Sequence, residues 1–334
     1  MQKLISKSEK FFIAGSTGMA GKAIVKALKS SGYGQPENGG ILLTPSRKEL
    51  NLINLNDVEN WFRTNRPSVV ILAAAKVGGI FANNTKPADF ILENLKIQNN
   101  VIEMAYKYEA KRFLFLGSSC IYPKFADQPI SESSLLTGSL EPTNQWYAIA
   151  KIAGLKLCES LSEQYKFDSI TLMPTNLYGP GDNYHPENSH VMASLISKFV
   201  KAKIESKPFV ECWGSGEPFR EFLHVDDLGD AVVFCLENWH PNSENSPKDL
   251  SGNPLNHLNV GTGKDISIKQ LAYKISELCG YKGNIIWDKT KPDGTPKKQL
   301  DISKILKLGW FPKISLDEGI RETIEIYKNK ISKC

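Results

Sequence analysis

The chain has 334 residues, of which 41% are hydrophobic and 23% are charged, and its formal net charge is +5. This length allows a large core in one domain or in two closely joined domains. The lysines are spread along the chain and form only modest clusters, so the composition argues against nucleic-acid binding and favours a solvated surface. Local attraction for a phosphorylated ligand is the alternative.

The chain has six scattered cysteines and no CxxC pair: Cys120, Cys158, Cys212, Cys235, Cys279 and Cys334. This spacing predicts neither disulfides nor a metal site, and it favours a reducing compartment. Residues 1–10 are polar and do not resemble a signal peptide. The longest apolar stretch, residues 69–75, is too short to cross a bilayer. We therefore expect a cytoplasmic protein with no metal and no membrane contact.

The first half of the chain alternates short apolar runs with amphipathic segments. Runs of strand length lie at residues 11–14, 41–44, 69–75 and 112–116. Continuous apolar runs of this kind are typical of strands that are covered on both faces. Helical patterns separate them at residues 20–30, 56–64, 87–108 and 144–165. This order predicts an α/β fold with a doubly wound parallel sheet of the Rossmann type.

The pattern changes after a further apolar run at residues 170–177. Residues 179–188 are rich in Gly, Pro, Asp and Asn, which marks a loop or a domain boundary. We expect a dinucleotide-binding domain over residues 1–178. A smaller α/β substrate lobe over residues 179–334 would follow, with some of its segments returning to the first domain. Its predicted elements are helices at 190–202 and 227–236, a strand at 209–213 and a polar loop at 238–256.

A glycine-rich turn follows the first predicted strand and opens the first predicted helix. Its residues are Gly15, Ser16, Thr17, Gly18, Met19, Ala20 and Gly21, with the spacing GxxGxxG. Glycine is needed where the backbone turns tightly and approaches a pyrophosphate, and the free helix N-terminus binds the anion. A glycine triplet alone is weak evidence, but the flanking strand and helix make this one a candidate dinucleotide site.

The end of the second predicted strand distinguishes NAD from NADP. Sites that prefer NAD usually place an acidic residue there to bind the ribose 2′-hydroxyl. This chain has Ser46 and Arg47 instead. An arginine can bind a 2′-phosphate through charge-assisted hydrogen bonds, so we expect NADP(H) as the cofactor. An ordinary surface arginine is the alternative interpretation of Arg47.

Tyr147 and Lys151 are four residues apart in a predicted helix and therefore lie on one face. A lysine ammonium about 4 Å from the phenol, at an effective dielectric of about 20, is worth roughly 4 kcal/mol. That interaction is expected to lower the tyrosine pKa by about three units, toward the range of a useful acid–base catalyst. Ser118, at the end of an apolar run, would hydrogen-bond the same substrate oxygen.

The glycine turn, Ser118 and the YxxxK pair together resemble the extended short-chain dehydrogenase/reductase family, and the resemblance covers the whole chain. Longer matching sequence segments narrow the resemblance to the epimerase-reductases of that family that act on a GDP-sugar. These segments occupy residues 73–80, 82–85, 117–123, 141–144, 174–180, 188–191, 213–216, 220–227 and 291–296.

The resemblance implies GDP-4-keto-6-deoxy-D-mannose as the substrate. It also implies two stages: epimerisation at C3 and C5, and then NADPH reduction of the C4 ketone to give GDP-L-fucose. Cys120 and His190 match the acid–base pair of the family. Inverting each carbon requires a proton to leave from one face and another to arrive on the opposite face, and a thiol and an imidazole can do this.

The resemblance also assigns binding roles. It carries substrate binding over to Lys198, Trp213, Arg220 and Asp293, and it implies a homodimer that uses the helices at 87–108 and 144–165. The residues expected to line the cofactor, beyond the glycine turn, Ser46 and Arg47, are Leu116, Gly117, Ser118, Ser119, Tyr147, Lys151, Pro174, Thr175, Asn176, Leu177 and His190.

The chain departs from the family pattern at two positions. Ser16 and Thr17 stand where bacterial members often carry a basic residue, which leaves Arg47 as the main 2′-phosphate anchor and allows dual use of NADPH and NADH. Lys198 stands where many members have arginine, which loses a bidentate fork but keeps the charge.

Two alternative functions remain open from the sequence. A related nucleotide-sugar 4-epimerase or 4,6-dehydratase has the same fold, but dehydratases typically show Asp-Glu where this chain has Ser119-Cys120. A non-catalytic dinucleotide sensor that binds protein partners belongs to another class. Such proteins commonly lose the tyrosine or the lysine, and both are present here.

Overall fold

The computed structural model describes residues 3–185, 189–249, 251–291 and 293–332. Asn188, Pro292 and Cys334, which belong to sequence patterns above, lie outside the described residues. The strands are β1 (Lys10–Ala14), β2 (Ile41–Leu43), β3 (Val69–Leu72), β4 (Arg112–Leu116), β5 (Ser169–Pro174), β6 (Asn176–Tyr178), β7 (Phe209–Trp213), β8 (Phe219–His224), β9 (His257–Val260), β10 (Asp265–Ser267), β11 (Asn284–Asp288) and β12 (Lys297–Lys298). The α-helices are α1 (Met19–Ser30), α2 (Leu55–Asn65), α3 (Ile80–Thr85), α4 (Pro87–Lys107), α5 (Gln145–Tyr165), α6 (Val191–Ile204), α7 (Val225–Asn238), α8 (Ile268–Cys279), α9 (Ser303–Leu308) and α10 (Leu316–Ile331). Short 3-10 helices are η1 (Pro36–Asn38), η2 (Ser119–Ile121) and η3 (Glu132–Ser134).

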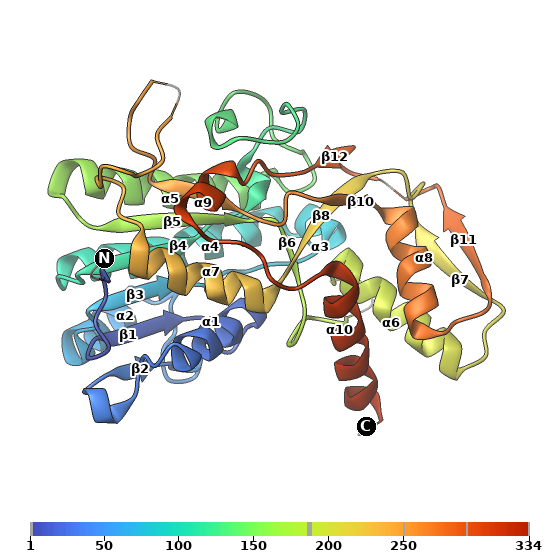
Figure 1. The fold of residues 1–334 in the computed structure, drawn as a ribbon, viewed down its shortest axis with the longest axis horizontal. Helices are drawn as coiled ribbons and strands as arrows, with labels where there is room; N and C mark the ends of the chain where they lie inside the picture. The colour runs from blue at the N-terminus through green and yellow to red at the C-terminus, as the bar shows by residue number, and fades with distance from the viewer. Residues whose placement is uncertain (1–2, 186–188, 250, 292, 333–334) are drawn as a thin grey trace.

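A six-stranded parallel sheet in the order β2-β1-β3-β4-β5-β9 forms the centre of the larger half. Side chains alternate across a strand, so neighbouring residues of β1 enter different cores. Phe11 and Ile13 pack on the side of α1 and α7, whereas Phe12 and Ala14 pack on the side of α2 and α4. Helices therefore cover both faces (Figure 1). The predicted α/β class and the doubly wound sheet are confirmed.

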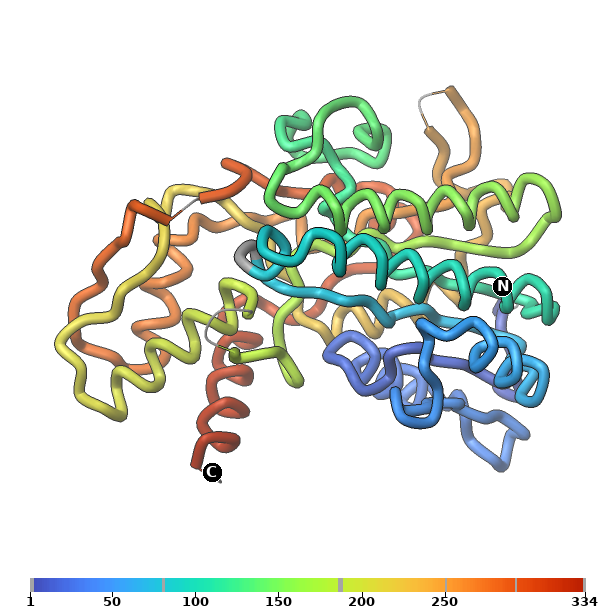
Figure 2. The backbone as a smooth tube through the Cα atoms, turned by 180° about the vertical axis from the view of Figure 1, so that it is seen from behind, coloured from blue at the N-terminus to red at the C-terminus, as the bar shows by residue number. Residues whose placement is uncertain are grey.

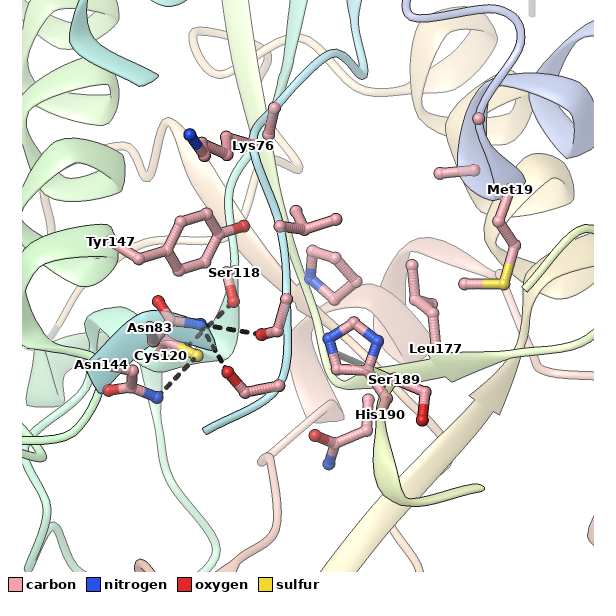
Figure 3. A pocket seen from close by; sticks show the side chains of 18 of the residues that line it. Met19, Lys76, Asn83, Ser118, Cys120, Asn144, Tyr147, Leu177, Ser189 and His190 are labelled. Carbon is pink, nitrogen blue, oxygen red and sulfur yellow. Dashed lines mark hydrogen bonds between the residues drawn. The ribbon is translucent and has the colours of Figure 1, made fainter. Parts of the chain in front are cut away.

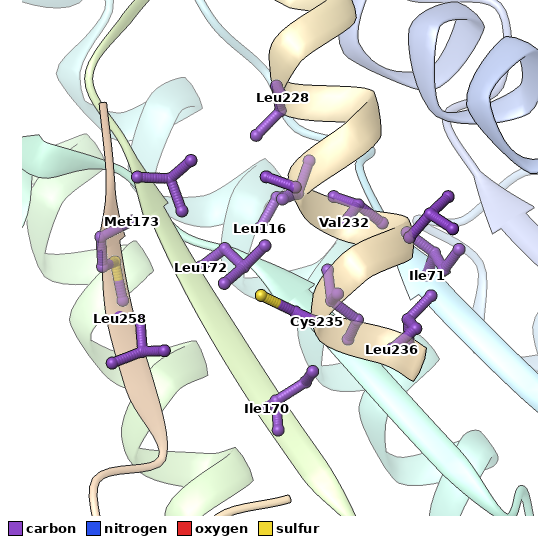
Figure 4. Close-up of a cluster of buried hydrophobic side chains, with 14 of the residues drawn as sticks. Ile71, Leu116, Ile170, Leu172, Met173, Leu228, Val232, Cys235, Leu236 and Leu258 are labelled. Carbon is purple, nitrogen blue, oxygen red and sulfur yellow. The ribbon is translucent and has the colours of Figure 1, made fainter. Parts of the chain in front are cut away.

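Two segments from the second half of the sequence complete this layer. Strand β9 pairs in parallel with β5, and α7 packs against α1. Figure 4 shows the apolar face of α7, including Leu228, Val232 and Leu236, against side chains of the sheet such as Ile71 and Leu172. Burial of this apolar face, which supplies most of a helix's stability, holds α7 to the first sheet.

The smaller lobe has its own core and its own sheets. Strand β8 pairs with β10, β12 and β6, and β7 pairs with β11. Helices α6, α8 and α10 pack around a separate apolar cluster that includes Phe199, Ile275 and Ile324. In Figures 1 and 2 these helices lie beside the strands β7 and β11 at one end of the molecule, away from β2 at the other end.

The apolar run at residues 170–177 is two strands rather than one. Strand β5 ends at Pro174, which has no N–H to donate to a sheet. The Thr175 N–H donates to the carbonyl of Val260, and β6 then pairs with β8 of the smaller lobe. The chain thus passes from one sheet to the other at Thr175, beside the carboxyl ends of the parallel strands.

No helix in the described part of the chain is long and apolar enough to span a membrane. A group of side chains able to hold a metal ion is likewise absent from residues 3–185, 189–249, 251–291 and 293–332.

Candidate active site

A cavity of about 920 Å³ is lined by residues of both halves of the molecule. Gly15, Ala73, Gly117 and Thr175 line it directly after β1, β3, β4 and β5. Ligands of open α/β sheets bind at this edge, outside the carboxyl ends of the strands. The position of the cavity therefore agrees with the dinucleotide site that the glycine turn predicts.

The glycine turn permits a close approach of backbone segments. A Cβ on Gly21 would lie 2.1 Å from the Gly15 carbonyl oxygen, and a Cβ on Gly15 would lie 2.6 Å from the Ala74 nitrogen. Gly18 is the N-cap of α1 and offers no side-chain cap, so the first N–H groups of the helix have no side-chain acceptor from it. A glycine cradle with an uncapped helix N-terminus fits the pyrophosphate of a dinucleotide.

Most residues expected to bind the cofactor line the cavity. They are Gly15, Thr17, Gly18, Met19, Ala20, Gly21, Arg47, Gly117, Ser118, Ser119, Tyr147, Pro174, Thr175, Asn176, Leu177 and His190. Ser16, Ser46, Leu116 and Lys151 are not among the lining residues. Ser16 is buried, and the Ser46 N–H donates to Glu49 Oε2 at 2.7 Å.

Lys151 lies behind the cavity wall with its ammonium turned to the backbone of β4. Its Nζ donates to the Leu116 carbonyl oxygen at 2.7 Å and lies 5.8 Å from the centre of the Tyr147 ring. Burial lowers the pKa of Lys151 to about 7. The neutral and charged forms of this lysine are therefore both accessible near neutral pH.

Tyr147 lies half-buried beside Ser118 (Figure 3). Burial raises the pKa of Tyr147, the nearby Cys120 raises it further, and a hydrogen bond with Ser118 lowers it. Lys151 is not among the groups that lower this pKa. The sequence-based prediction that the ammonium lowers the phenol pKa by about three units is therefore wrong for this geometry, because the ammonium is bound to the Leu116 carbonyl.

Cys120 lies in η2, two residues after Ser118. The Cys120 N–H donates to Ser118 Oγ at 3.3 Å, which makes Ser118 the N-cap of this short helix. Two nitrogen donors approach the Cys120 sulfur: Asn144 Nδ2 at 3.5 Å and Lys298 Nζ at 3.4 Å. Asn144 comes directly before α5, whereas Lys298 comes from β12 of the other sheet.

His190 faces these groups from across the cavity. It is the N-cap of α6. Its side chain is exposed to the cavity, and many protein atoms lie close around it. This burial lowers the pKa of His190 and favours the neutral imidazole. Figure 3 shows Ser118, Cys120 and Tyr147 on one side and His190 with Leu177 on the other. A thiol and an imidazole thus approach the same space from two directions.

The four residues expected to bind substrate lie together at the end of the cavity formed by the smaller lobe: Lys198, Trp213, Arg220 and Asp293. Two ammonium groups flank the Trp213 ring, with Lys198 Nζ 5.3 Å and Lys291 Nζ 5.4 Å from its centre. Arg220 Nη2 donates to the Asp293 carbonyl at 3.4 Å, and the Asp293 carboxylate accepts from Ser215 N and Oγ, both at 2.8 Å. Burial lowers the pKa of Lys198. Cations beside an exposed aromatic ring are suited to a phosphorylated nucleotide.

Several polar residues of the cavity wall were given no role by sequence reasoning, among them Asn83, Asn144 and Lys298. Asn83 and Asn144 lie in the segments 82–85 and 141–144 that carry the family resemblance, but the contact of Asn144 with Cys120 leaves no pattern along the chain. Lys298 belongs to a surface-type lysine pair with Lys297, which carries no signal of a role in the site. Asn83 is buried and donates to the carbonyls of Gly78 and Gly79.

Comparison with known proteins agrees with the fold. The model of the NAD dependent epimerase/dehydratase family matches residues 11–250, and the chain belongs to this family. A putative GDP-L-fucose synthase 2 of Arabidopsis thaliana is 53% identical, over 98% of this chain and 94% of the relative. The GDP-L-fucose synthase of Escherichia coli K12 is 49% identical, over 95% and 96%. The NADP-bound structure of MlghC, a GDP-mannoheptose C4 reductase of Campylobacter jejuni, has a TM-score of 0.85 and 36% identity, and covers 97% of this chain and 99% of MlghC.

Proposed function

We propose that the chain is an epimerase-reductase that converts GDP-4-keto-6-deoxy-D-mannose to GDP-L-fucose. The observation that carries the proposal is the placement of Cys120 and His190 on opposite sides of a cavity that also holds Tyr147 and the glycine turn. The identity of about half of all residues with proteins named GDP-L-fucose synthase, over nearly the whole chain, supports the same substrate.

The first stage inverts C3 and C5. Protons on carbons beside a ketone are acidic because the electron pair moves onto the carbonyl oxygen as an enolate. Ser118 and Tyr147 donate hydrogen bonds to that oxygen and stabilise the charge as it develops. Cys120 and His190 exchange protons with the carbons from opposite faces, so each centre is inverted without any change in oxidation state.

The second stage reduces the C4 ketone. The nicotinamide, when bound, supplies the hydride. Tyr147 delivers the proton to the oxygen, and Ser118 holds that oxygen in place. Lys151 orients the cofactor ribose from its position against the Leu116 carbonyl.

NADP(H) is the cofactor that the site favours. Residues 15–21 hold the pyrophosphate, and residues 174–177 and 117–119 line the nicotinamide. Arg47 lines the cavity at the end of β2 and anchors the 2′-phosphate. The NADP-bound state of the related MlghC supports this choice.

The GDP portion of the substrate occupies the cavity end in the smaller lobe. Arg220 and Lys198 neutralise the diphosphate, and Trp213 packs beside it. The Asp293 carboxylate accepts hydrogen bonds from the nucleotide in addition to those from Ser215.

A C4 reductase that acts on a GDP-heptose without epimerisation is the second candidate function. The similarity to MlghC favours it, although at 36% identity rather than 53%. The two functions differ in a measurable way, because only the epimerase-reductase incorporates solvent deuterium at C3 and C5 of the keto sugar.

We further propose a division into a dinucleotide-binding domain at residues 1–178 and a substrate lobe at 179–334, with β9 and α7 returning to the first sheet. We also propose a homodimer and a cytoplasmic location. Exposed apolar side chains on two neighbouring helices, Leu92 of α4 and Trp146 and Ile149 of α5, support the dimer.

Tyr147→Phe tests the proposed function. The variant keeps the ring but loses the proton that must reach the substrate oxygen, so NADPH oxidation with GDP-4-keto-6-deoxy-D-mannose should slow by a factor on the order of 10² or more. NADPH binding, measured by fluorescence titration, should remain close to that of the unmodified chain. Tyr165→Phe on the exposed end of the same helix is the matched control and should keep full activity. Full activity of Tyr147→Phe would contradict the assignment.

A further inference from the structure

Two nitrogen donors from distant parts of the chain lie within hydrogen-bonding distance of the Cys120 sulfur. Lys298 Nζ lies 3.4 Å and Asn144 Nδ2 lies 3.5 Å from the Cys120 sulfur. A lysine ammonium has three donors and no acceptor, so the sulfur must be the acceptor in this contact. A thiolate accepts such bonds far better than a thiol does. Figure 3 shows the Asn144 amide directed at the sulfur.

The backbone of β12 aims Lys298 at the site. Lys298 is paired in register with Arg220 of β8, and the next two N–H groups are held by Gln128 Oε1 at 2.9 Å and Glu221 Oε2 at 2.7 Å. Successive side chains of a strand point to opposite faces. Lys297 accordingly turns away and pairs with Asp265 at 3.2 Å. Among the described residues, Lys298 has no carboxylate partner in an ion pair.

The other charged groups around Cys120 do not cancel this ammonium. Arg220 of β8 is a second cation close to Cys120. Two acids lie in this region: Glu141 is paired with Lys124 at 2.9 Å, and the Asp293 carboxylate, which also acts on Arg220, accepts hydrogen bonds from Ser215. Tyr147 of α5 also faces the sulfur and has a raised pKa, so it is neutral near pH 7. His190 faces the region from α6 as a neutral imidazole. The surroundings of the sulfur are therefore positive.

We propose that Lys298 is a positioning residue that holds Cys120 as a thiolate, the form that removes the substrate proton. The proposal deepens the function proposed above and rests on it for the reaction step. In that step the substrate C–H bond breaks, an S–H bond forms on Cys120, and the electron pair moves onto the C4 oxygen. Lys298 acts through the sulfur and takes no proton itself.

Alkylation of the full chain by iodoacetamide, without substrate, tests the proposal directly. Thiolate and not thiol reacts, so the rate reports the ionised fraction. Mass spectrometry of the peptide that contains Cys120 separates it from the buried Cys158, Cys212, Cys235 and Cys279. The rate is followed from about pH 5.5 to 9.5 for the unmodified chain and for Lys298→Gln, Lys298→Met, Lys298→Arg and Lys297→Gln.

We expect Lys298→Gln and Lys298→Met to move the inflection of the rate to higher pH by about one unit or more, which lowers the rate at pH 7 several-fold. Lys298→Arg keeps the charge and should nearly restore the profile. Lys297→Gln is the matched control from the same strand and should leave the profile unchanged. Coincident profiles of the unmodified chain and both neutral variants would overturn the proposal, as would an equal shift in Lys297→Gln.

Exchange of substrate protons with deuterium at C3 and C5 adds a kinetic readout. Lys298→Gln should lower the maximal exchange rate at saturating substrate and move its pH dependence in the same direction as alkylation. A higher KM with an unchanged alkylation profile would mean that Lys298 only binds substrate, and it would overturn the proposal. Because alkylation needs no substrate, a wrong choice of sugar would leave that result intact, so the two failures are distinguishable.

Discussion

Burial of the Lys151 ammonium destabilises the folded chain by an amount that depends on pH. Its residue is 3% exposed, and burial lowers its pKa from 10.5 to about 7. Below pH 7 both the folded and the unfolded chain hold the proton, so the full cost of burying the ammonium is present. Between pH 7 and 10.5 only the unfolded chain holds the proton, and stability therefore rises with pH because of this group.

We expect Lys151→Met to stabilise the chain without cofactor by about 1–3 kcal/mol at pH 6. Methionine keeps the apolar contact near Phe115, although the Leu116 carbonyl loses its donor at a cost of about 1 kcal/mol, which is included in that range. The gain should shrink steadily as the pH approaches 10. Urea unfolding at several pH values measures it. A gain that is the same at pH 6 and pH 10 would contradict the explanation, and Lys156→Met on the exposed face of α5 is the control.

Arg47 is the residue on which the preference for NADPH depends. A charge-assisted contact with the 2′-phosphate is worth about 1.5–3 kcal/mol, so Arg47→Ala should raise the NADPH dissociation constant by a factor on the order of 10 to 100. The NADH constant should change little. Titration of both cofactors measures the effect, and Lys48→Ala next to it, outside the cavity lining, is the control. Equal losses for NADPH and NADH would remove the phosphate role.

At the scale of elements, the turn between β1 and α1 is the part of the site whose shape depends most on glycine, which has no side chain. A Cβ on Gly21 would lie 2.1 Å from the Gly15 carbonyl, whereas a Cβ on Gly18 would meet nothing closer than the same oxygen at 3.5 Å. The two glycines are only three residues apart. Packing within the protein therefore requires glycine at position 21. It does not require glycine at position 18.

Gly21→Ala should accordingly lower the free energy of unfolding of the chain without cofactor by about 2 kcal/mol or more, because the backbone must move to admit the Cβ. Its melting temperature should fall as a result. Gly18→Ala should leave the melting temperature nearly unchanged. Differential scanning calorimetry of the two variants makes the comparison. Equal destabilisation would show that the packing of the turn does not distinguish them.

The elements themselves were largely predictable from local patterns. The predicted helix at 87–108 is α4 (Pro87–Lys107), and the strand at 209–213 is β7 (Phe209–Trp213). The patterns predict these elements because burial of one helix face or of a whole strand imposes a period on the sequence. Pro174 and the polar Thr175 and Asn176 are compatible with a break in the run at 170–177, but only the pairing of β6 with β8 shows that the chain enters a second sheet there.

At the scale of the whole molecule, the proposed homodimer would cover an apolar surface on α4 and α5. Trp146 is 40% and Ile149 is 37% exposed, on a helix that packs beside α4. Sedimentation equilibrium should give twice the chain mass of 37.2 kDa. Ile149→Glu places a charge in the proposed interface and should weaken association by at least tenfold. Phe311→Glu, at another exposed apolar residue, should not. A monomeric unmodified chain would contradict the dimer.

The sequence alone predicted the fold class, which the structure confirms, and it marked the glycine turn, Tyr147, Lys151, Cys120 and His190 as candidate site residues. These follow from local spacing and from matching sequence segments, which need no knowledge of distant contacts. The tertiary structure decided that Lys151 binds a backbone carbonyl and that Lys298 reaches Cys120 across 178 residues of chain. Such contacts depend on which strands pair and in what register across two lobes, and no local period in the sequence records that pairing.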